Sequence, residues 1–131
     1  MLKVGDQVPD FISKDQDGTI IKLSDFQGKK LIVFFYPRAN TPGCTAEACN
    51  LRDNYNSLKA AGYELLGVSE DSARKQTNFK NKYELPFPLL SDEDHTVINA
   101  FGVWGPKKFM GREFEGILRT TFLIDEDGVV E

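Results

Sequence analysis

The seven-residue segment KLIVFFY, residues 30–36, limits the possible folds of this chain more than any other feature. It is bounded by Gly28 and Pro37, two residue types that interrupt regular structure. A continuous apolar run of this length is typical of a strand that is covered on both faces of a sheet. We therefore expect a central strand here, with helices flanking the sheet.

A second apolar run, residues 63–69 (YELLGVS), follows the first at a distance that leaves room for a helix. Residues 45–61 are rich in Ala, Leu, Glu and Lys and contain no Gly or Pro. Four apolar positions recur at helical spacing in this stretch: Ala48, Leu51, Tyr55 and Leu58. Strand, helix and strand in this order indicate a parallel, right-handed crossover unit.

Shorter patterns complete the arrangement on either side of this unit. Residues 11–13 and 19–23 are typical of short strands around an Asp-Gly turn, so we expect an N-terminal β-hairpin. A helix is expected over residues 72–82. Another is expected after Ser91, whose spacing to Asp94 resembles a helix N-cap.

The C-terminal part is less regular. Residues 104–110 lie between glycines and are expected to form a loop, whereas residues 119–124 are typical of a strand and residues 129–131 begin another. The chain then stops in mid-pattern, so we expect a C-terminal strand and helix to be missing from this sequence. The whole order predicts a thioredoxin-like α/β fold: a central mixed β-sheet flanked by helices, with residues 1–131 forming a single domain.

Composition excludes several classes of protein. The longest apolar run has six residues, far short of the roughly 20 that a transmembrane helix needs. The first residues lack a basic segment followed by an apolar stretch, so no secretory signal is expected and a cytoplasmic location is favoured. The net charge of −4, without a cluster of Lys and Arg, argues against nucleic-acid binding.

The chain has two cysteines, Cys44 and Cys49. In a reducing compartment, a close pair is more often redox-active or metal-binding than structural. With a lone His95, the Cys-x4-Cys spacing leaves a zinc ion short of ligands, so no metal is expected. The spacing also differs from the Cys-x-x-Cys of disulfide reductases. Two buried, inert cysteines remain the main alternative.

Cys44 lies where the first apolar strand has ended and the first helix begins, at the edge where open α/β sheets bind ligands. Unpaired backbone N–H groups and the helix dipole favour an anion there, and the anion would be its own thiolate. A fast reaction also needs donors that stabilise charge in the transition state. Candidates are the Thr41 hydroxyl, the N–H groups of Gly43 and Cys44, and an arginine.

The two cysteines are five residues apart. On one ideal helix this separation is about 140° around the axis and roughly 8–9 Å between Cα atoms. A disulfide needs Cα atoms closer than about 7 Å. If both residues lie on one helix, they bond only after its first turns unwind, which predicts a conformational change coupled to oxidation.

Pro37-x-x-x-Thr41-x-x-Cys44 resembles the active-site motif of the peroxiredoxins. Residues 36–49 are similar to the peroxiredoxin Q or bacterioferritin comigratory protein subfamily. The resemblance continues through residues 66–69, 85–92, 102–105 and 119–125, and therefore covers essentially the whole chain.

This resemblance implies a role for five residues. Cys44 corresponds to the peroxidatic cysteine, which becomes a sulfenic acid, and Cys49 to a resolving cysteine that forms an intramolecular disulfide with it. Thr41 corresponds to the threonine that contacts thiolate and peroxide. Pro37 corresponds to the proline that shields the pocket from water. Arg119 corresponds to the arginine that pairs with the thiolate, although the sequence alone favours a surface arginine on a strand.

The function implied is a thiol peroxidase that reduces hydrogen peroxide and small organic hydroperoxides and is recycled by thioredoxin or a similar dithiol. No metal, haem or flavin cofactor is implied, and a monomer is favoured. The alternative is a redox sensor whose Cys44–Cys49 switch controls a partner without significant turnover. A third hypothesis, an inert binding module of the same fold, requires a Cys44 that does not react with peroxide.

Overall fold

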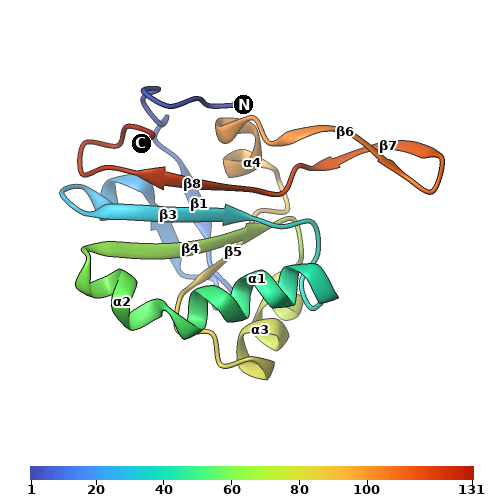
Figure 1. Cartoon of the computed structure of the whole chain (residues 1–131), viewed down its shortest axis with the longest axis horizontal. Coiled ribbons are helices and arrows are strands. Elements are labelled where there is room, and N and C mark those ends of the chain that lie inside the picture. Colours follow the sequence, from blue (N-terminus) through green and yellow to red (C-terminus); the bar gives the residue numbers. More distant parts are fainter.

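The computed structural model describes residues 1–131, apart from the side chain of Phe109. Its centre is a sheet of four strands: β3 (Lys30–Phe35), β4 (Tyr63–Ser69), β5 (Leu89–Ser91) and β8 (Thr120–Ile124). The strand order is β5-β4-β3-β8 (Figure 1). Strand β3 runs parallel to β4 and antiparallel to β8, and β4 runs parallel to β5. The predicted mixed sheet and the central position of residues 30–36 are confirmed.

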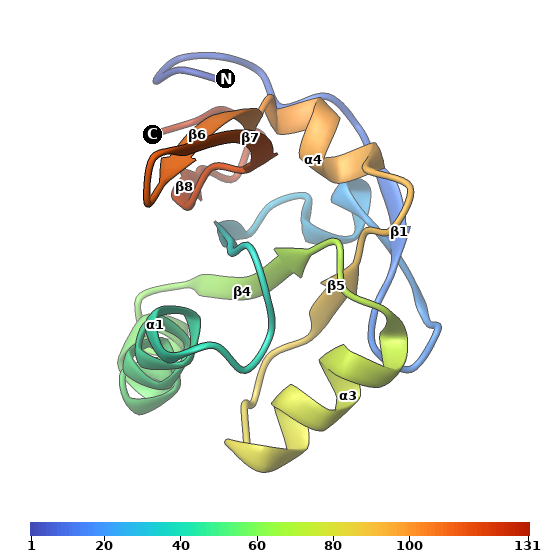
Figure 2. The same ribbon diagram turned by 90° about the vertical axis from the view of Figure 1, so that its right-hand side faces the viewer.

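Helices cover both faces of this sheet. They are α1 (Pro42–Asp53), α2 (Tyr55–Ala60), α3 (Ala73–Lys82) and α4 (Thr96–Phe101). Helices α1 and α3 lie on one face and α4 lies on the other, with the sheet between them (Figure 2). Helix α3 matches the prediction, and the Ser72 side chain caps it by accepting a hydrogen bond from the Lys75 N–H.

Strand β3 explains why both faces are covered. Leu31, Val33 and Phe35 belong to the core on the α4 side, whereas Ile32 and Phe34 belong to the core under α1 and α3. Successive side chains of a strand point to opposite faces, so an unbroken apolar run supplies two cores at once. Beside it, a Cβ on Gly67 would lie 2.8 Å from Phe34 Cζ, so this close packing requires glycine in β4.

The helix expected over residues 45–61 differs from the prediction at both its start and its middle. It begins at Pro42 and is interrupted at Asn54, which separates α1 from α2. The Asn54 side-chain amide donates to the Asn50 carbonyl oxygen at 2.9 Å and competes with the backbone for it. Asparagine commonly ends helices in this way, because its side chain offers the backbone an alternative partner.

The expected cap at Ser91 and Asp94 is wrong. Ser91 lies in β5, and the buried Asp92 accepts from the N–H groups of Val97 at 3.1 Å and Ile98 at 2.7 Å. Burial raises the pKa of Asp92, and the two backbone hydrogen bonds oppose that shift. The cap therefore comes from outside the usual N-cap position, which spacing alone does not reveal.

The loop expected at residues 104–110 is also wrong. Strands β6 (Trp104–Phe109) and β7 (Arg112–Ile117) form an antiparallel ribbon that projects from the body (Figure 1). Met110 and Gly111 connect them with φ angles of 50° and 78°, as a tight hairpin turn requires. The pattern was missed because Pro and Lys occupy the middle of β6, where alternation with apolar residues is weak.

The segments near the two chain ends pair with each other, since the Val8 N–H donates to the Gly128 carbonyl oxygen at 2.8 Å. The predicted N-terminal hairpin is present as β1 (Ile12–Lys14) and β2 (Ile20–Lys22), followed by a 3-10 turn, η1 (Leu23–Phe26). The strand expected at residues 129–131 forms only isolated bridges, from Val129 to Gln7 and from Val130 to Ile124. Within the described part of the chain, no helix is long and apolar enough to cross a membrane.

Candidate active site

Cys44 lies at the carboxyl end of β3, in the first turn of α1. The chain leaves β3 at Phe35, and Thr41 occupies the N-cap position of α1. Cys44 is 1% exposed and packs in the same core as Ala48. Its sulfur therefore sits at the helix end whose free N–H groups and dipole favour an anion, as the sequence predicted.

Arg119, the residue directly before β8, reaches the Cys44 sulfur with its side chain. Its Nη2 donates to Cys44 Sγ at 3.1 Å. The register of β3 and β8 pairs Phe35 with Thr120, so the residue before Thr120 lies beside the end of β3. The Arg119 side chain is 42% exposed, but its guanidinium contacts both Cys44 and Glu47. A cation this close stabilises a thiolate and leaves other N–H donors free for a bound molecule.

Glu47 holds the Arg119 guanidinium, and the missing side chain of Gly43 leaves room for it. Sequence patterns did not single out Glu47, and they pointed to Gly43 only for its backbone N–H. Glu47 Oε2 lies 3.6 Å from Arg119 Nη1, and its other carboxylate oxygen accepts from the Thr121 hydroxyl at 3.1 Å. A Cβ on Gly43 would lie only 3.2 Å from both terminal guanidinium nitrogens. The signal for Glu47 was its position three residues after Cys44, which places it on the same side of a helix.

Thr41 and Pro37 lie in the loop that leads from β3 to α1 and Cys44. The Thr41 hydroxyl donates to the Arg38 carbonyl oxygen at 3.0 Å. Its contact with a thiolate or a peroxide therefore stays a prediction. Pro37 is half-buried directly after the last core residue of this segment, Tyr36.

A series of hydrogen bonds connects this loop to polar side chains in the core. The Tyr36 hydroxyl donates to Gln76 Oε1, and the Gln76 amide donates to Ser69 Oγ at 3.0 Å. Ser69 Oγ donates to Asp71 Oδ2 at 2.7 Å, and the same oxygen accepts from the Ala39 N–H at 2.7 Å. Burial raises the pKa of Tyr36 far above its usual range, so this hydroxyl stays a neutral donor.

Cys49 lies on the same unbroken helix as Cys44. Both cysteines are free thiols, and Cys49 is half-buried. The condition of the sequence argument is met, because residues five apart on one helix are about 140° apart around its axis. Direct bonding of the two sulfurs therefore requires part of α1 to unwind.

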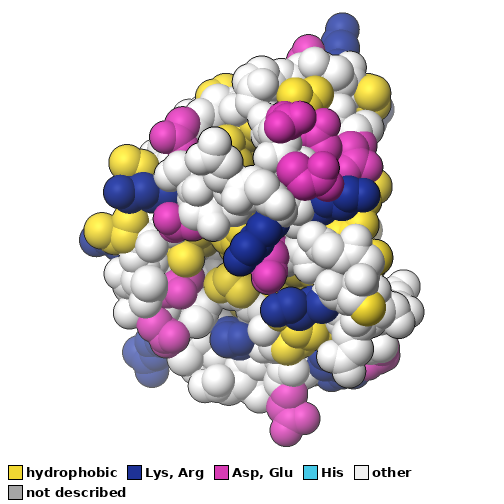
Figure 3. All heavy atoms as spheres, turned by 90° about the vertical axis from the view of Figure 1, so that its left-hand side faces the viewer, with side chains coloured by type: hydrophobic (Ala, Val, Ile, Leu, Met, Phe, Trp, Pro, Cys, Tyr) yellow, Lys and Arg dark blue, Asp and Glu magenta, His cyan; other side chains and the backbone are white. Residues whose placement is uncertain are grey.

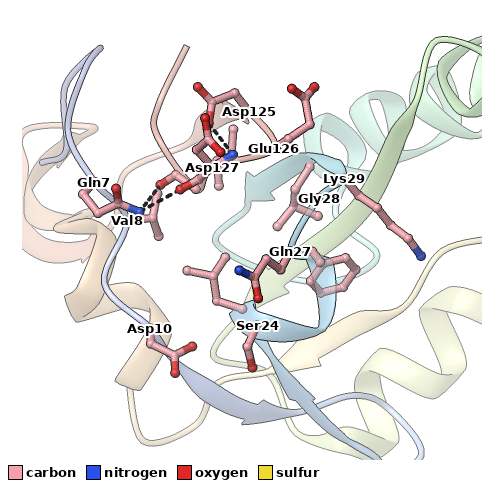
Figure 4. Close-up of a pocket in the computed structure, with 15 residues that line it drawn as sticks. Gln7, Val8, Asp10, Ser24, Gln27, Gly28, Lys29, Asp125, Glu126 and Asp127 are labelled. Atoms are coloured by element: carbon pink, nitrogen blue, oxygen red, sulfur yellow. Dashed lines mark hydrogen bonds between the residues drawn. The ribbon is translucent and has the colours of Figure 1, made fainter.

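No group of three His, Cys, Asp or Glu side chains among the described residues is placed to hold a metal ion. A cleft of about 500 Å³ lies at the opposite, amino end of β3. Gln7 lines this cleft, and its side-chain amide donates to the carbonyl oxygens of Asp127 at 3.0 Å and Gly128 at 3.1 Å (Figure 4). On this face of the molecule, acidic side chains cluster at one edge, and Lys and Arg side chains and apolar atoms lie beside and between them (Figure 3).

Comparison with known proteins places this geometry. The model of the AhpC/TSA family matches residues 4–131. Peroxiredoxin Bcp of Escherichia coli (strain K12) is 55% identical over 130 residues, which are 99% of this chain and 83% of that protein. These matches confirm the resemblance drawn from the residues around Cys44.

Two solved structures share the fold. The crystal structure of peroxidoxin BcpB from Mycobacterium tuberculosis is 40% identical, with a TM-score of 0.87 over 99% of this chain and 83% of that one. A structure of the Xanthomonas campestris bacterioferritin comigratory protein is 36% identical, with a TM-score of 0.86 over 92% of this chain and 76% of that one. The chain thus belongs to the AhpC/TSA family, with peroxiredoxin Q and Bcp proteins as its relatives, and is a thiol-dependent peroxidase.

Proposed function

We propose that Cys44 is the residue that attacks the peroxide. Its thiolate sulfur attacks one oxygen of the peroxide, so that an S–O bond forms while the O–O bond breaks. Cys44 becomes a sulfenic acid, and the other oxygen takes a proton and leaves as water or an alcohol. The 3.1 Å contact between Arg119 Nη2 and Cys44 Sγ carries this assignment. It pairs a cation with the one buried thiol at a helix N-terminus.

Arg119 acts twice in this scheme. Its charge favours the thiolate before the reaction, and its remaining N–H groups donate to the oxygen on which negative charge develops as the O–O bond breaks. The low exposure of Cys44 strengthens both interactions, because charges interact more strongly where water is excluded. Glu47 orients the guanidinium for this purpose, and Gly43 leaves the space that it occupies.

Thr41 and Pro37 complete the site. The Thr41 hydroxyl donates its proton to the Arg38 carbonyl oxygen, so its own oxygen is available as an acceptor for a peroxide O–H. Pro37 has no backbone N–H, so it adds an apolar wall without a donor that would hold water at the thiolate. Both roles follow the resemblance of this loop to the peroxiredoxin motif.

Cys49 resolves the sulfenic acid in this proposal. Its sulfur attacks Cys44 Sγ, an S–S bond forms, the S–O bond breaks, and hydroxide leaves with the thiol proton as water. Unwinding of α1 brings the sulfurs together. Thioredoxin or a similar dithiol then reduces the disulfide by thiol–disulfide exchange.

The substrates are hydrogen peroxide and small organic hydroperoxides. The related Xanthomonas campestris protein is described as reducing alkyl peroxides, which supports the organic class here. We also propose a cytoplasmic monomer. The large apolar side chains that are exposed are spread over several elements: Ile12 and Ile20 share the β1–β2 hairpin, whereas Phe114 lies on β7 and Leu123 on β8. Light scattering on the purified protein tests the monomer.

Peroxide consumption with thioredoxin, thioredoxin reductase and NADPH tests the chemistry. Wild-type protein is expected to turn over rapidly, and Cys44→Ser to lose all activity above background. Cys49→Ser is expected to consume one equivalent of peroxide and then stop. Normal cycling by Cys49→Ser would rule out Cys49 as the resolving residue. Oxidation of the wild type without turnover would favour a redox sensor or another reductant, and repeating the assay with dithiothreitol separates those two.

A further inference from the structure

Tyr83, the residue that ends α3, contacts the segment that carries both cysteines at each of its ends. Its hydroxyl donates to Asn40 Oδ1 at 2.9 Å, just before α1 begins. Its carbonyl oxygen accepts from Arg52 Nη1 at 2.7 Å, in the last turn of α1. Cys44 and Cys49 both lie between these two attachment points.

Tyr83 is itself held firmly by the core. Its ring packs edge-on against Phe79, with ring centroids 5.6 Å apart and planes at 77°. Phe79 is fully buried under the sheet. The Tyr83 N–H also donates to the Phe79 carbonyl oxygen at 3.3 Å. Tyr83 is therefore anchored on α3. Its two hydrogen bonds attach the loop before α1 and the last turn of α1 to that anchor.

The attachment at Asn40 controls where α1 starts. Asn40 has a φ of 63°, in the left-handed region that asparagine tolerates better than most residues. It is followed directly by the N-cap Thr41 and by Pro42, the first residue of the helix. Lys82 Nζ lies 3.5 Å from the same Asn40 oxygen, so two side chains from the end of α3 converge on it.

We propose that Tyr83 fastens the cysteine-bearing segment in its helical form and thereby sets the rate at which the Cys44 sulfenic acid condenses with Cys49. Tyr83 is a positioning residue, because it touches neither sulfur. This inference rests on the resolving role proposed for Cys49. Condensation needs the first turns of α1 to unwind, and unwinding breaks the Asn40 attachment while α3 stays in place.

The fastening also decides the fate of the sulfenic acid. A helix that opens rarely leaves the sulfenic acid exposed to a second peroxide, which oxidises it to the sulfinic acid. A helix that opens often favours the disulfide. Loosening the attachment should therefore speed disulfide formation and lower the sulfinic yield at a given peroxide concentration, while the first reaction of Cys44 with peroxide keeps its rate.

Tyr83→Phe isolates the hydroxyl, since the ring against Phe79 and the carbonyl that holds Arg52 both remain. Tyr63→Phe is the matched control, because the Tyr63 hydroxyl donates to Glu131 at 3.5 Å, away from α1. Amide hydrogen exchange is measured on the reduced proteins. Loss of one exposed hydrogen bond should raise exchange at residues 45–49 about two- to fivefold. Exchange in β3 and β4 should stay as in the wild type.

An Asn40→Gly background sharpens the test, because glycine keeps the positive φ and removes the acceptor. In that background, Tyr83→Phe should change exchange no further. Unchanged exchange at residues 45–49 in Tyr83→Phe would overturn the proposal. Equal increases in β3 and β4, or in Tyr63→Phe, would overturn it as well, because they would indicate general loosening.

Rapid-quench mass spectrometry completes the experiment. The disulfide should form about two- to fivefold faster in Tyr83→Phe, with less sulfinic acid at each peroxide concentration. An unchanged disulfide rate despite faster exchange would overturn the rate control. A wild type that forms no Cys44–Cys49 disulfide would overturn the resolving role of Cys49 and this rate control with it. The exchange comparison would still decide whether Tyr83 fastens α1.

Discussion

The two ends of β3 differ in a way that runs against intuition about functional sites. The amino end opens into a cleft of about 500 Å³, whereas the carboxyl end holds a sulfur on a residue that is 1% exposed. In the mechanism that we propose, the chemistry nevertheless takes place at the closed end. There, a thiol, a guanidinium and a carboxylate converge within hydrogen-bonding or ion-pairing distance. Our proposal therefore places the reaction where charged groups converge rather than where the hollow is large.

The two ends are also held together differently. At the amino end, turns at the surface make the contacts, such as the bonds from Gln7 to neighbouring carbonyl oxygens. At the carboxyl end, hydrogen bonds among side chains that include the buried Gln76 and Ser69 connect the core to the loop between β3 and α1. Substitutions at the carboxyl end should therefore change the rate of the reaction with peroxide or strongly lower the free energy of unfolding. Substitutions at the amino end should lower the free energy of unfolding only modestly.

Arg119→Met should have the largest effect. Removing a donor aimed at the charge that develops in the transition state costs about 100-fold in rate. Stopped-flow measurement of the second-order rate constant with hydrogen peroxide checks this, and slower alkylation of Cys44 by iodoacetamide should accompany it. Arg112→Met, on the exposed β7, is the control. A rate within threefold of wild type would contradict the role of Arg119.

Gln76→Leu should destabilise the fold by about 2 kcal/mol, because it leaves the buried Tyr36 hydroxyl without its acceptor. The Leu90 carbonyl oxygen also loses its 2.8 Å donor. Urea unfolding measures the change. Gln27→Leu, at the exposed cleft, should leave the free energy of unfolding nearly unaltered. Equal effects of the two substitutions would refute the difference between the ends.

Gly43→Ala should slow the reaction with peroxide about fivefold. The new methyl group would lie 3.2 Å from the guanidinium nitrogens, so Arg119 must shift by a few tenths of an ångström from Cys44. Alanine is a better helix former than glycine, so thermal stability should not fall. Slower chemistry without lost stability separates this effect from damage to the fold. Ser57→Ala on α2 is the control, and it should leave the rate unchanged.

Asp125→Ala should have the smallest effect and should act only at the amino end. Its Oδ1 accepts from the N–H groups of Asp127 and Val129, both at 2.9 Å, and fixes the turn after β8. Loss of these partly exposed bonds should cost roughly 0.5–1 kcal/mol in urea unfolding. The peroxide rate constant should stay at the wild-type value. A clear drop in that constant would show that the two ends are coupled.

Local pattern was enough for much of the fold. The run at residues 30–36 predicted a strand covered on both faces, and the pattern from Ala48 to Leu58 predicted helix. It did not predict the break at Asn54 or the cap from Asp92, because both depend on hydrogen bonds between a side chain and the backbone, which the apolar pattern does not reveal. The β6–β7 ribbon was missed because its strands lack regular alternation and are defined by their pairing.

The sequence by itself predicted the position of Cys44 at a helix start. It also predicted that Cys44 and Cys49 need unwinding before they can bond if they share one helix, and the structure places both on α1. Both follow from short-range spacing, which helix geometry converts directly into direction and distance. Only the tertiary structure decided that Arg119 meets the sulfur of Cys44, 75 residues away along the chain, and that Tyr83 meets Asn40. Those contacts depend on strand register and helix packing, which arise when distant segments bury their apolar faces together.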